Sequence, residues 1–223
     1  MRRKHNSMIH TNGHLLCAVD VETTGADPMI HEIFQIGILP LDSNLNVLRT
    51  VEPFYMNITP MDMEVIDPRA LKITKTNLAY LIQHSLDTFT VMDLLDEWFN
   101  RLELPITTNQ SKKIMPVWSN GDFDKAMLIS WLGKDLYDTY FYFHERDTQH
   151  SALQINDRFY QHGDKVPFPK VGLSYLANCF DIDTSNAHDA LADCLTTAEV
   201  YKKLCMMQMP MIPGACTPRT VEI

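Results

Sequence analysis

The run AVDVETTG at residues 18–25 places two carboxylates, Asp20 and Glu22, in a segment that is otherwise apolar and rich in β-forming residues. Residues two apart in a strand point to the same side of a sheet, so both carboxylates converge on one point. Two like charges at that spacing repel, and one of them takes up a proton unless a cation lies between them. Because Mg²⁺ prefers carboxylate oxygens, the pair predicts a divalent-metal site. The alternative is a strand end whose acids reach solvent or cap the turn that Thr23 and Thr24 form.

A third carboxylate, Asp124, stands in WSNGDFDKAML at the start of a predicted helix. Acidic residues in a first helical turn also complement the helix dipole, so Asp124 alone carries little weight. We expect Asp122 to cap this helix, which leaves Asp124 free to face a cleft while Phe123 and Met127 face the core.

The last predicted helix contributes His188 and Asp193. Five residues separate them by ~140° on an ideal helix, so they converge only if His188 lies in the lead-in and Asp193 within the helix. The segment TSNAH at 184–188 supplies residues that favour helix caps. A histidine on such a lead-in is a suitable general base, although a surface histidine beside a core helix is the simpler alternative.

Hydrophobic patterning shows which elements position these residues. Strands are predicted at 15–21, 32–42, 47–58, 114–119 and near 138–143, with 32–42 and 47–58 forming a hairpin across the turn DSNLN. Helices are predicted at 67–74 (capped by Asp67, with Pro68 first), 88–102, 122–132, 171–180 and 187–204. This order predicts an α/β fold: an RNase H-like, mixed five-stranded sheet, an antiparallel meander followed by parallel strands, flanked by helices.

The 223 residues suit one domain at 15–205, with a polar lead-in at 1–14 and a Met- and Pro-rich tail at 206–223. A net charge of −9 argues against a broad nucleic-acid coat protein, but not against an enzyme that holds a few nucleotides at a metal. Five dispersed cysteines and the lack of a signal-type or membrane-spanning apolar run indicate a reduced, cytoplasmic protein without a membrane partner.

Taken in order, Asp-x-Glu on the first strand, Phe-Asp opening a middle helix and His-x4-Asp in the last helix resemble the DEDDh branch of the DnaQ-like 3′→5′ exonucleases, of the RNase T-like superfamily. The runs ETTG, EIFQIGI and IDPRALKIT support this resemblance, which covers roughly residues 15–205. VWSNGDFD followed by ERDT looks most like the phage-type exonucleases and the small exoribonucleases of this superfamily.

The resemblance implies two divalent ions, Mg²⁺ or Mn²⁺, held by Asp20, Glu22, Asp124 and Asp193. It implies that His188 accepts the proton of the attacking water as general base. The substrate would be the 3′ end of a single-stranded nucleic acid, DNA or RNA, and the product a nucleoside 5′-monophosphate. By the same resemblance, Thr23 and Thr24 would lie beside the terminal sugar and donate backbone N–H groups to its 3′-hydroxyl.

One residue departs from the family pattern, because many relatives carry a bulky apolar residue where this chain has Ala26. Either Met29 or Ile30 substitutes for it, or the terminal base is held in a different way. The other function class is a catalytically silent nuclease-like fold that binds nucleic acid or protein. The five filled positions favour activity. The sequence leaves open the DNA or RNA preference, the pathway and the oligomeric state, a homodimer included.

Overall fold

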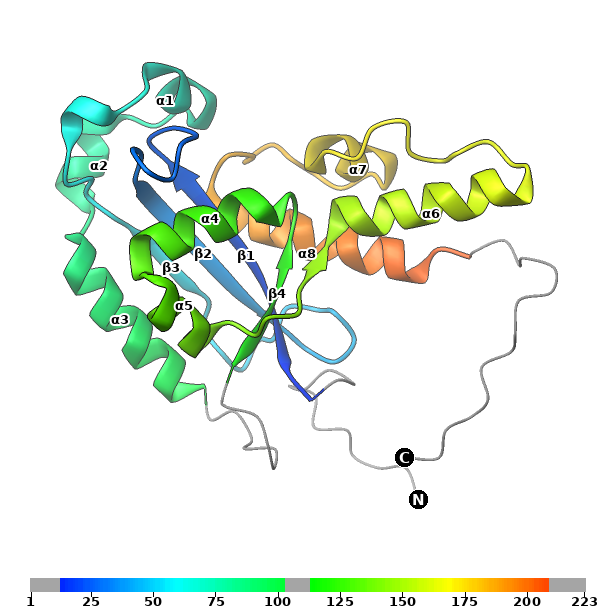
Figure 1. Ribbon diagram of the computed structural model, residues 1–223, viewed down its shortest axis with the longest axis horizontal. Coiled ribbons are helices and arrows are strands. Elements are labelled where there is room, and N and C mark those ends of the chain that lie inside the picture. Colours follow the sequence, from blue (N-terminus) through cyan, green and yellow to red (C-terminus); the bar gives the residue numbers. More distant parts are fainter. Residues whose placement is uncertain (1–12, 103–112, 209–223) are drawn as a thin grey trace.

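The computed structural model describes residues 13–102 and 113–208. Their centre is a five-stranded sheet of order β3-β2-β1-β4-β5 (Figure 1). Strands β1 and β3 are antiparallel to β2, whereas β4 is parallel to β1 and β5 is parallel to β4. The bounds are β1 (Leu15–Thr23), β2 (Ile33–Leu41), β3 (Phe54–Asn57), β4 (Ile114–Trp118) and β5 (Arg146–Asp147). The predicted α/β fold with an RNase H-like mixed sheet is confirmed.

Helices cover both faces of this sheet (Figure 1). In chain order the described helices are the 3-10 turn η1 (Met63–Val65), α1 (Pro68–Thr74), α2 (Leu78–His84), α3 (Thr88–Arg101), α4 (Gly121–Leu132), α5 (Lys134–Tyr140), α6 (Thr148–His162), α7 (Leu173–Cys179) and α8 (Ala190–Met206). None of the helices within 13–102 and 113–208 is long and apolar enough to cross a membrane.

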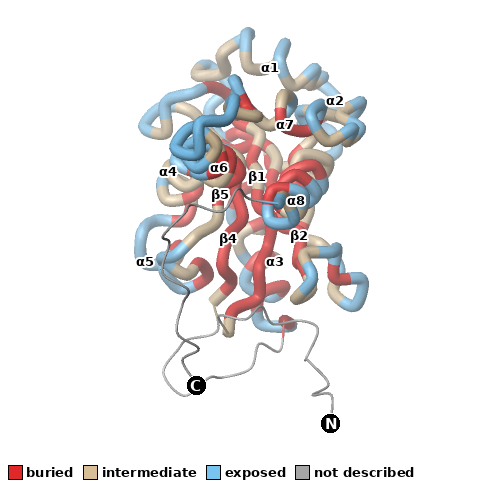
Figure 2. The backbone as a smooth tube through the Cα atoms, turned by 90° about the vertical axis from the view of Figure 1, so that its right-hand side faces the viewer, coloured by how far each residue is buried: buried red, intermediate tan, exposed pale blue. Residues whose placement is uncertain are grey.

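The alternating side chains of β1 separate two cores. Leu15, Cys17 and Val19 point toward α3, α4 and α5, in a core that also holds Trp98. Leu16 and Ala18 point the other way and pack with Cys194, Ala198 and Tyr201 of α8. Helices α6 and α7 then pack on the outer side of α8. Figure 2 shows the buried residues running through the strands, with exposed positions on the outer helices. Two helices that carry acids, α4 and α8, therefore approach the sheet from opposite faces.

Two strand predictions were wrong. The segment 47–58 is a strand only over Phe54–Asn57. Before it, Asp42 accepts the N–H groups of Asn44 and Asn46 and turns the chain, and Val47 makes a single bridge to Leu41. Of the strand predicted near 138–143, residues 138–140 belong to helix α5 and Phe141 makes a single parallel bridge to Ile114; the fifth strand is instead Arg146–Asp147. Aromatic residues at 137, 140 and 141 have the spacing of one helical face, and all three are buried.

The helix predictions at 67–74, 88–102, 122–132 and 171–180 are confirmed to within two residues, and Asp67 caps α1 with Pro68 first. Two caps were wrong. Asn120, in the left-handed conformation, precedes α4 in place of Asp122. Helix α8 begins at Ala190 with Asp189 as its cap, not at residue 187. Helices α2 and α6 were not predicted. The predicted lead-in and tail lie outside the described residues except for 13–14 and 206–208, so the domain limits stay a prediction.

Helix α8 approaches β2 closely at Gly37. A Cβ added there would lie 2.7 Å from the carbonyl oxygen of Ala190 and 3.1 Å from the sulfur of Cys194. Both atoms belong to the first turns of α8, so Gly37 sets how near the start of this helix lies to the sheet.

We expect Gly37→Ala to lower the free energy of unfolding by about 1–3 kcal/mol, because backbone atoms of α8 must move to admit the methyl group. Urea denaturation measures this change. Gly172→Ala is the matched control, because an added Cβ there meets nothing within 4 Å and only a helix-cap preference is lost. Equal losses in the two variants would contradict the close approach of α8.

Candidate active site

The first two carboxylates lie at the carboxyl end of β1, on the face that α8 covers. Asp20 and Glu22 continue the row of Leu16 and Ala18, whose side chains pack on α8. Val21 between them points to the other core. Both acids are part-buried, so the strand presents two carboxylates to the first turns of α8.

The third carboxylate comes from the opposite face of the sheet. Helix α4 follows β4 directly, after Asn120 turns the chain with a φ of 71°. Its start is held by Asp147, whose carboxylate accepts the N–H of Gly121 at 2.9 Å. Asp124 is only 5% exposed, and its Oδ1 accepts the N–H of Val21 at 3.0 Å. This hydrogen bond fixes Asp124 against β1 at Val21, the residue between Asp20 and Glu22.

His188 and Asp193 lie at the start of α8, as predicted from their spacing. His188 is in the lead-in with a φ of 72°, and Asp193 lies in the first turn of the helix. The N–H of His188 donates to Asp193 Oδ2 at 3.1 Å. A left-handed residue other than glycine costs roughly 1 kcal/mol or more, so the surrounding structure must hold His188 in this conformation.

These five residues line one cavity of about 380 Å³. One ligand atom each from Glu22, His188 and Asp193 lie within 4.8 Å of one another. The rest of the wall includes Phe123 and the segment that joins β4 to α4. The full lining is Asp20, Val21, Glu22, Ser119, Asn120, Phe123, Asp124, Leu173, Ser174, Thr184, Ala187, His188, Asp193 and Thr196.

The acids destabilise one another's charged form. Burial raises the pKa of Asp20 well above its usual value, and the nearby Asp124 and Glu22 raise it further. Burial and the charge of Asp193 raise the pKa of Glu22 to about 8. Burial raises the pKa of Asp124 to about 7, although the N–H of Val21 opposes this. Burial also raises the pKa of Asp193. The cluster therefore lacks positive charge at neutral pH.

A divalent cation fits this donor set. The oxygens of Asp20, Glu22, Asp124 and Asp193 are hard ligands of the type that Mg²⁺ and Mn²⁺ bind. Their mutual repulsion and burial favour either protons or a cation between them. The exposed imidazole of His188 stands at the rim of the same group. These four carboxylates could hold a metal, and the His188 ring has a nitrogen close enough to Glu22 and Asp193 to join them.

Thr23 and Thr24, the predicted contacts of a terminal sugar, serve the turn after β1. Thr23 Oγ1 donates to the carbonyl of Gly25 at 2.7 Å. Thr24 N–H donates to the carbonyl of Glu32, and Thr24 Oγ1 accepts the N–H of Glu32. The backbone donor of Thr24 is thus already used, so a role in binding the sugar stays a prediction for both residues.

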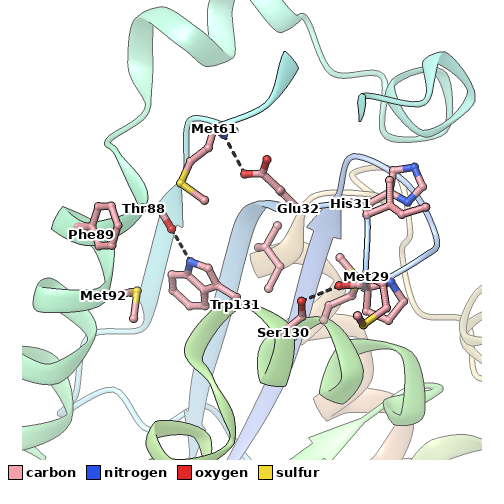
Figure 3. A pocket seen from close by; sticks show the side chains of 13 residues that line it. Met29, His31, Glu32, Met61, Thr88, Phe89, Met92, Ser130 and Trp131 are labelled. Atoms are coloured by element: carbon pink, nitrogen blue, oxygen red, sulfur yellow. Dashed lines mark hydrogen bonds between the residues drawn. The ribbon is translucent and has the colours of Figure 1, made fainter. Parts of the chain in front are cut away.

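Met29 and Ile30 do not reach the carboxylates. They line a second pocket of about 330 Å³, which shares no residue with the carboxylate cavity. In Figure 3 Met29 lies near Ser130, and the indole of Trp131 donates to Thr88 deeper between α3 and α4. The prediction that Met29 or Ile30 replaces the bulky residue missing at Ala26 therefore finds no support in this structure.

The sequence left several scaffold residues unassigned. Asp147 caps α6, and its carboxylate also accepts the N–H of Gly121 at the start of α4. Asp189 caps α8, and an Asp just before the Ala-Leu run is a cap signal that could have been recognised. The side-chain oxygen of Gln35 accepts the N–H of Ala190 at 2.8 Å, and no local sequence pattern predicts this contact.

We expect the metal-free protein to lose stability as pH rises from about 5 to 8. The folded-state pKa values of Glu22 (about 8) and Asp124 (about 7) lie above those of unfolded chains, so the folded state holds more protons in this range. Mg²⁺ or Mn²⁺ binds the charged form, and should therefore raise the melting temperature more at pH 8 than at pH 6. Thermal scans with and without EDTA measure this; a pH-independent metal effect would contradict it.

We also expect Asp124→Asn to raise the free energy of unfolding of the metal-free protein at pH 8 by at least about 1 kcal/mol. The amide oxygen still accepts the N–H of Val21, while the buried charge is gone. Asp122→Asn, an exposed acid on the same helix, is the control and should change little. Denaturation at pH 8 and at pH 5 distinguishes the two variants. The increase in the free energy of unfolding that we expect for Asp124→Asn should be smaller at pH 5, where the wild-type carboxyl is already protonated.

Similar folds occur in solved nucleases. An exonuclease I structure matches with a TM-score of 0.66 and 19% identity over 87% of this chain and 41% of that one. E. coli exonuclease I in complex with a dT13 oligonucleotide matches with a TM-score of 0.63 and 20% identity, over 86% of this chain and 41% of that one. Cell-death related nuclease 4 (CRN-4) matches with a TM-score of 0.63 and 16% identity, over 86% of this chain and 63% of that one. At these identities the likeness concerns the fold.

This chain spans about two fifths of the exonuclease I chains and 63% of CRN-4. No curated protein matches its sequence. A family model described as exonuclease matches residues 17–201, which include most of β1 and α8, all of α4 and all five cavity-lining candidates. The chain belongs to this exonuclease family and has its DnaQ-like, RNase H-like fold.

Proposed function

We propose that this exonuclease is a divalent-metal-dependent enzyme that removes nucleotides from the 3′ end of single-stranded DNA or RNA and releases nucleoside 5′-monophosphates. One observation carries the proposal: carboxylates from β1, α4 and α8 line a single cavity with an exposed histidine. Membership of an exonuclease family supports phosphodiester hydrolysis as the reaction. Solved exonuclease I complexes with dT13 and dA16 support a single-stranded substrate.

Asp20, Glu22, Asp124 and Asp193 would hold two ions, Mg²⁺ or Mn²⁺. When bound, such ions supply positive charge that stabilises the oxygens of a phosphodiester during in-line attack. The protein's part is to keep the four carboxylates together despite their repulsion. Asp124 is fixed by Val21, and Asp193 by His188. These hydrogen bonds hold two of the four carboxylates in place before an ion binds, which is the type of preorganisation that lowers a barrier.

His188 is proposed as the general base. Its ring lies within reach of Glu22 and Asp193, and it is exposed at the rim of the cavity. An imidazole there can accept the proton of the attacking water and pass it to solvent. His188 lies two residues before the start of α8, and this position leaves its ring accessible to solvent.

Phe123 is the proposed contact for the terminal base. It is part-buried, lines the carboxylate cavity and precedes Asp124. Flat aromatic side chains bind bases by stacking, without reading their sequence. By contrast, Trp118 is fully buried in the core and Trp131 lines the other pocket. A cavity of about 380 Å³ falls in the range of small-ligand sites.

The decisive experiment is a side-by-side digest of 3′-labelled and 5′-labelled single-stranded DNA and RNA, with Mg²⁺, Mn²⁺ and EDTA. We expect the 3′ label to be released first as a mononucleotide, and only with metal. Asp20→Ala should lower the rate at least about 10³-fold, because the remaining acids cannot complete the ion site. Asp122→Asn should keep full activity. Metal-independent binding of the oligonucleotide without cleavage would favour the silent binding module instead.

His188→Ala should lower kcat by about 10²–10⁴-fold, the usual contribution of a general base. The metal-induced rise in melting temperature should remain, because the four carboxylates are intact. Single-turnover kinetics at saturating metal, together with thermal scans, measure both effects. Loss of the metal-induced stabilisation in this variant would assign His188 to metal binding rather than to proton transfer.

A further inference from the structure

The start of α8 is tied to β3 through its cap residue. Asp189 Oδ1 accepts the N–H of Ala192 at 3.0 Å, which is the cap of the helix. Asp189 Oδ2 accepts a hydrogen bond of 2.5 Å from the hydroxyl of Tyr55 in β3. The carboxylate of Asp189, the residue after His188, is therefore hydrogen-bonded through one oxygen to α8 and through the other to β3.

A second connection comes from β2. Gln35 lies opposite Asn57 in the β2–β3 pairing. Its Oε1 accepts the N–H of Ala190 at 2.8 Å. Its Nε2 donates to Tyr55 Oη and to Asn57 Oδ1, each at 2.9 Å. Tyr55 Oη therefore accepts from Gln35 and donates to Asp189, so one continuous network joins two strands to the first turn of α8.

His188 is the residue just before this anchored turn. Its φ of 72° lies in the left-handed region, which a residue with a Cβ leaves unless its surroundings hold it. On one side its N–H is bound by Asp193, and on the other its neighbours Asp189 and Ala190 are bound by Tyr55 and Gln35. The backbone at His188 is thus fixed from both directions.

We propose that Gln35 and Tyr55 are positioning residues that hold His188 in its left-handed conformation, with its ring at the carboxylate cluster. The inference rests on the proposed function of His188 and adds two residues outside the carboxylate cavity to it. The body of α8 stays attached to the sheet through Cys194, Ala198 and Tyr201. Loss of the network should therefore misplace His188 without unfolding the protein.

Tyr55→Phe in the full chain removes one hydroxyl group and tests this. We expect kcat to fall at least about 10-fold, KM for a single-stranded oligonucleotide to stay within about twofold, and the Mg²⁺-induced rise in melting temperature to persist. Tyr80→Phe is the matched control, because Tyr55 and Tyr80 both line a groove of about 890 Å³ and the side chain of Tyr80 is exposed. Equal kcat values in the two variants would overturn the inference.

A double variant tests the route through Asp189. Asp189→Asn keeps an oxygen for the N–H of Ala192 but weakens the contact with Tyr55. If Tyr55 acts through Asp189, the variant Tyr55→Phe/Asp189→Asn should be no slower than the slower single variant. Additive losses would overturn the proposed route.

Amide hydrogen exchange provides a readout that needs no activity. In the metal-free protein, Tyr55→Phe should speed exchange at Ala190 and Ala192 at least about 10-fold, and Tyr80→Phe should not. Unchanged exchange at both amides would overturn the inference even in an active enzyme. A wild-type chain without metal-dependent hydrolysis would refute the proposed function instead, and the exchange rates would still decide whether Gln35 and Tyr55 hold this turn.

Discussion

The structure depends on keeping four carboxylates close together in a part-buried cavity. Asp20, Glu22, Asp124 and Asp193 repel one another, and burial weakens the hydration that would otherwise offset their charge. Without a cation the favourable response is to take up protons, as the raised pKa values indicate. Such a cluster reduces the stability of the fold at neutral pH, and this cost is typical of a site preorganised for a charged ligand.

The scaffold meets this demand with short, directed hydrogen bonds. Asp147 holds the first residue of α4, and Val21 holds Asp124. Gln35 and Asp189 do the same for the first turn of α8. Each helix follows a left-handed residue: Asn120 turns the chain from β4 into α4, and His188 turns the loop after α7 into α8. These helix starts therefore bring Asp124 and Asp193 to the two acids of β1.

The two faces of the sheet are covered by different helices. One face packs α3, α4 and α5 into the larger core, and the other packs α8. The carboxylates gather where these layers end, at the carboxyl ends of the parallel strands β1 and β4, which is the usual ligand site of open α/β sheets. The methionine-lined pocket between α3 and α4 shares no wall with this site. Phe123, which lines the carboxylate cavity, is therefore the proposed contact for the terminal base.

The sequence by itself determined the order of the main elements and the identity of the acids. Period-two spacing put Asp20 and Glu22 on one face, and the five-residue interval required His188 to precede its helix. Both are local consequences of backbone geometry. The segments at 47–53 and 138–140 were misread as strands, because turns and short aromatic helices resemble strands in composition.

Only the tertiary structure decided which loops and strands support the site. The contacts of Gln35 with Ala190, Tyr55 with Asp189 and Asp147 with Gly121 join residues 155, 134 and 26 positions apart. The use of Thr24 N–H by Glu32 and the separate pocket of Met29 depend on how one loop folds back. Hydrogen bonds between distant segments leave no periodic trace in a sequence, because each depends on the registers and packing of elements that the local pattern does not encode.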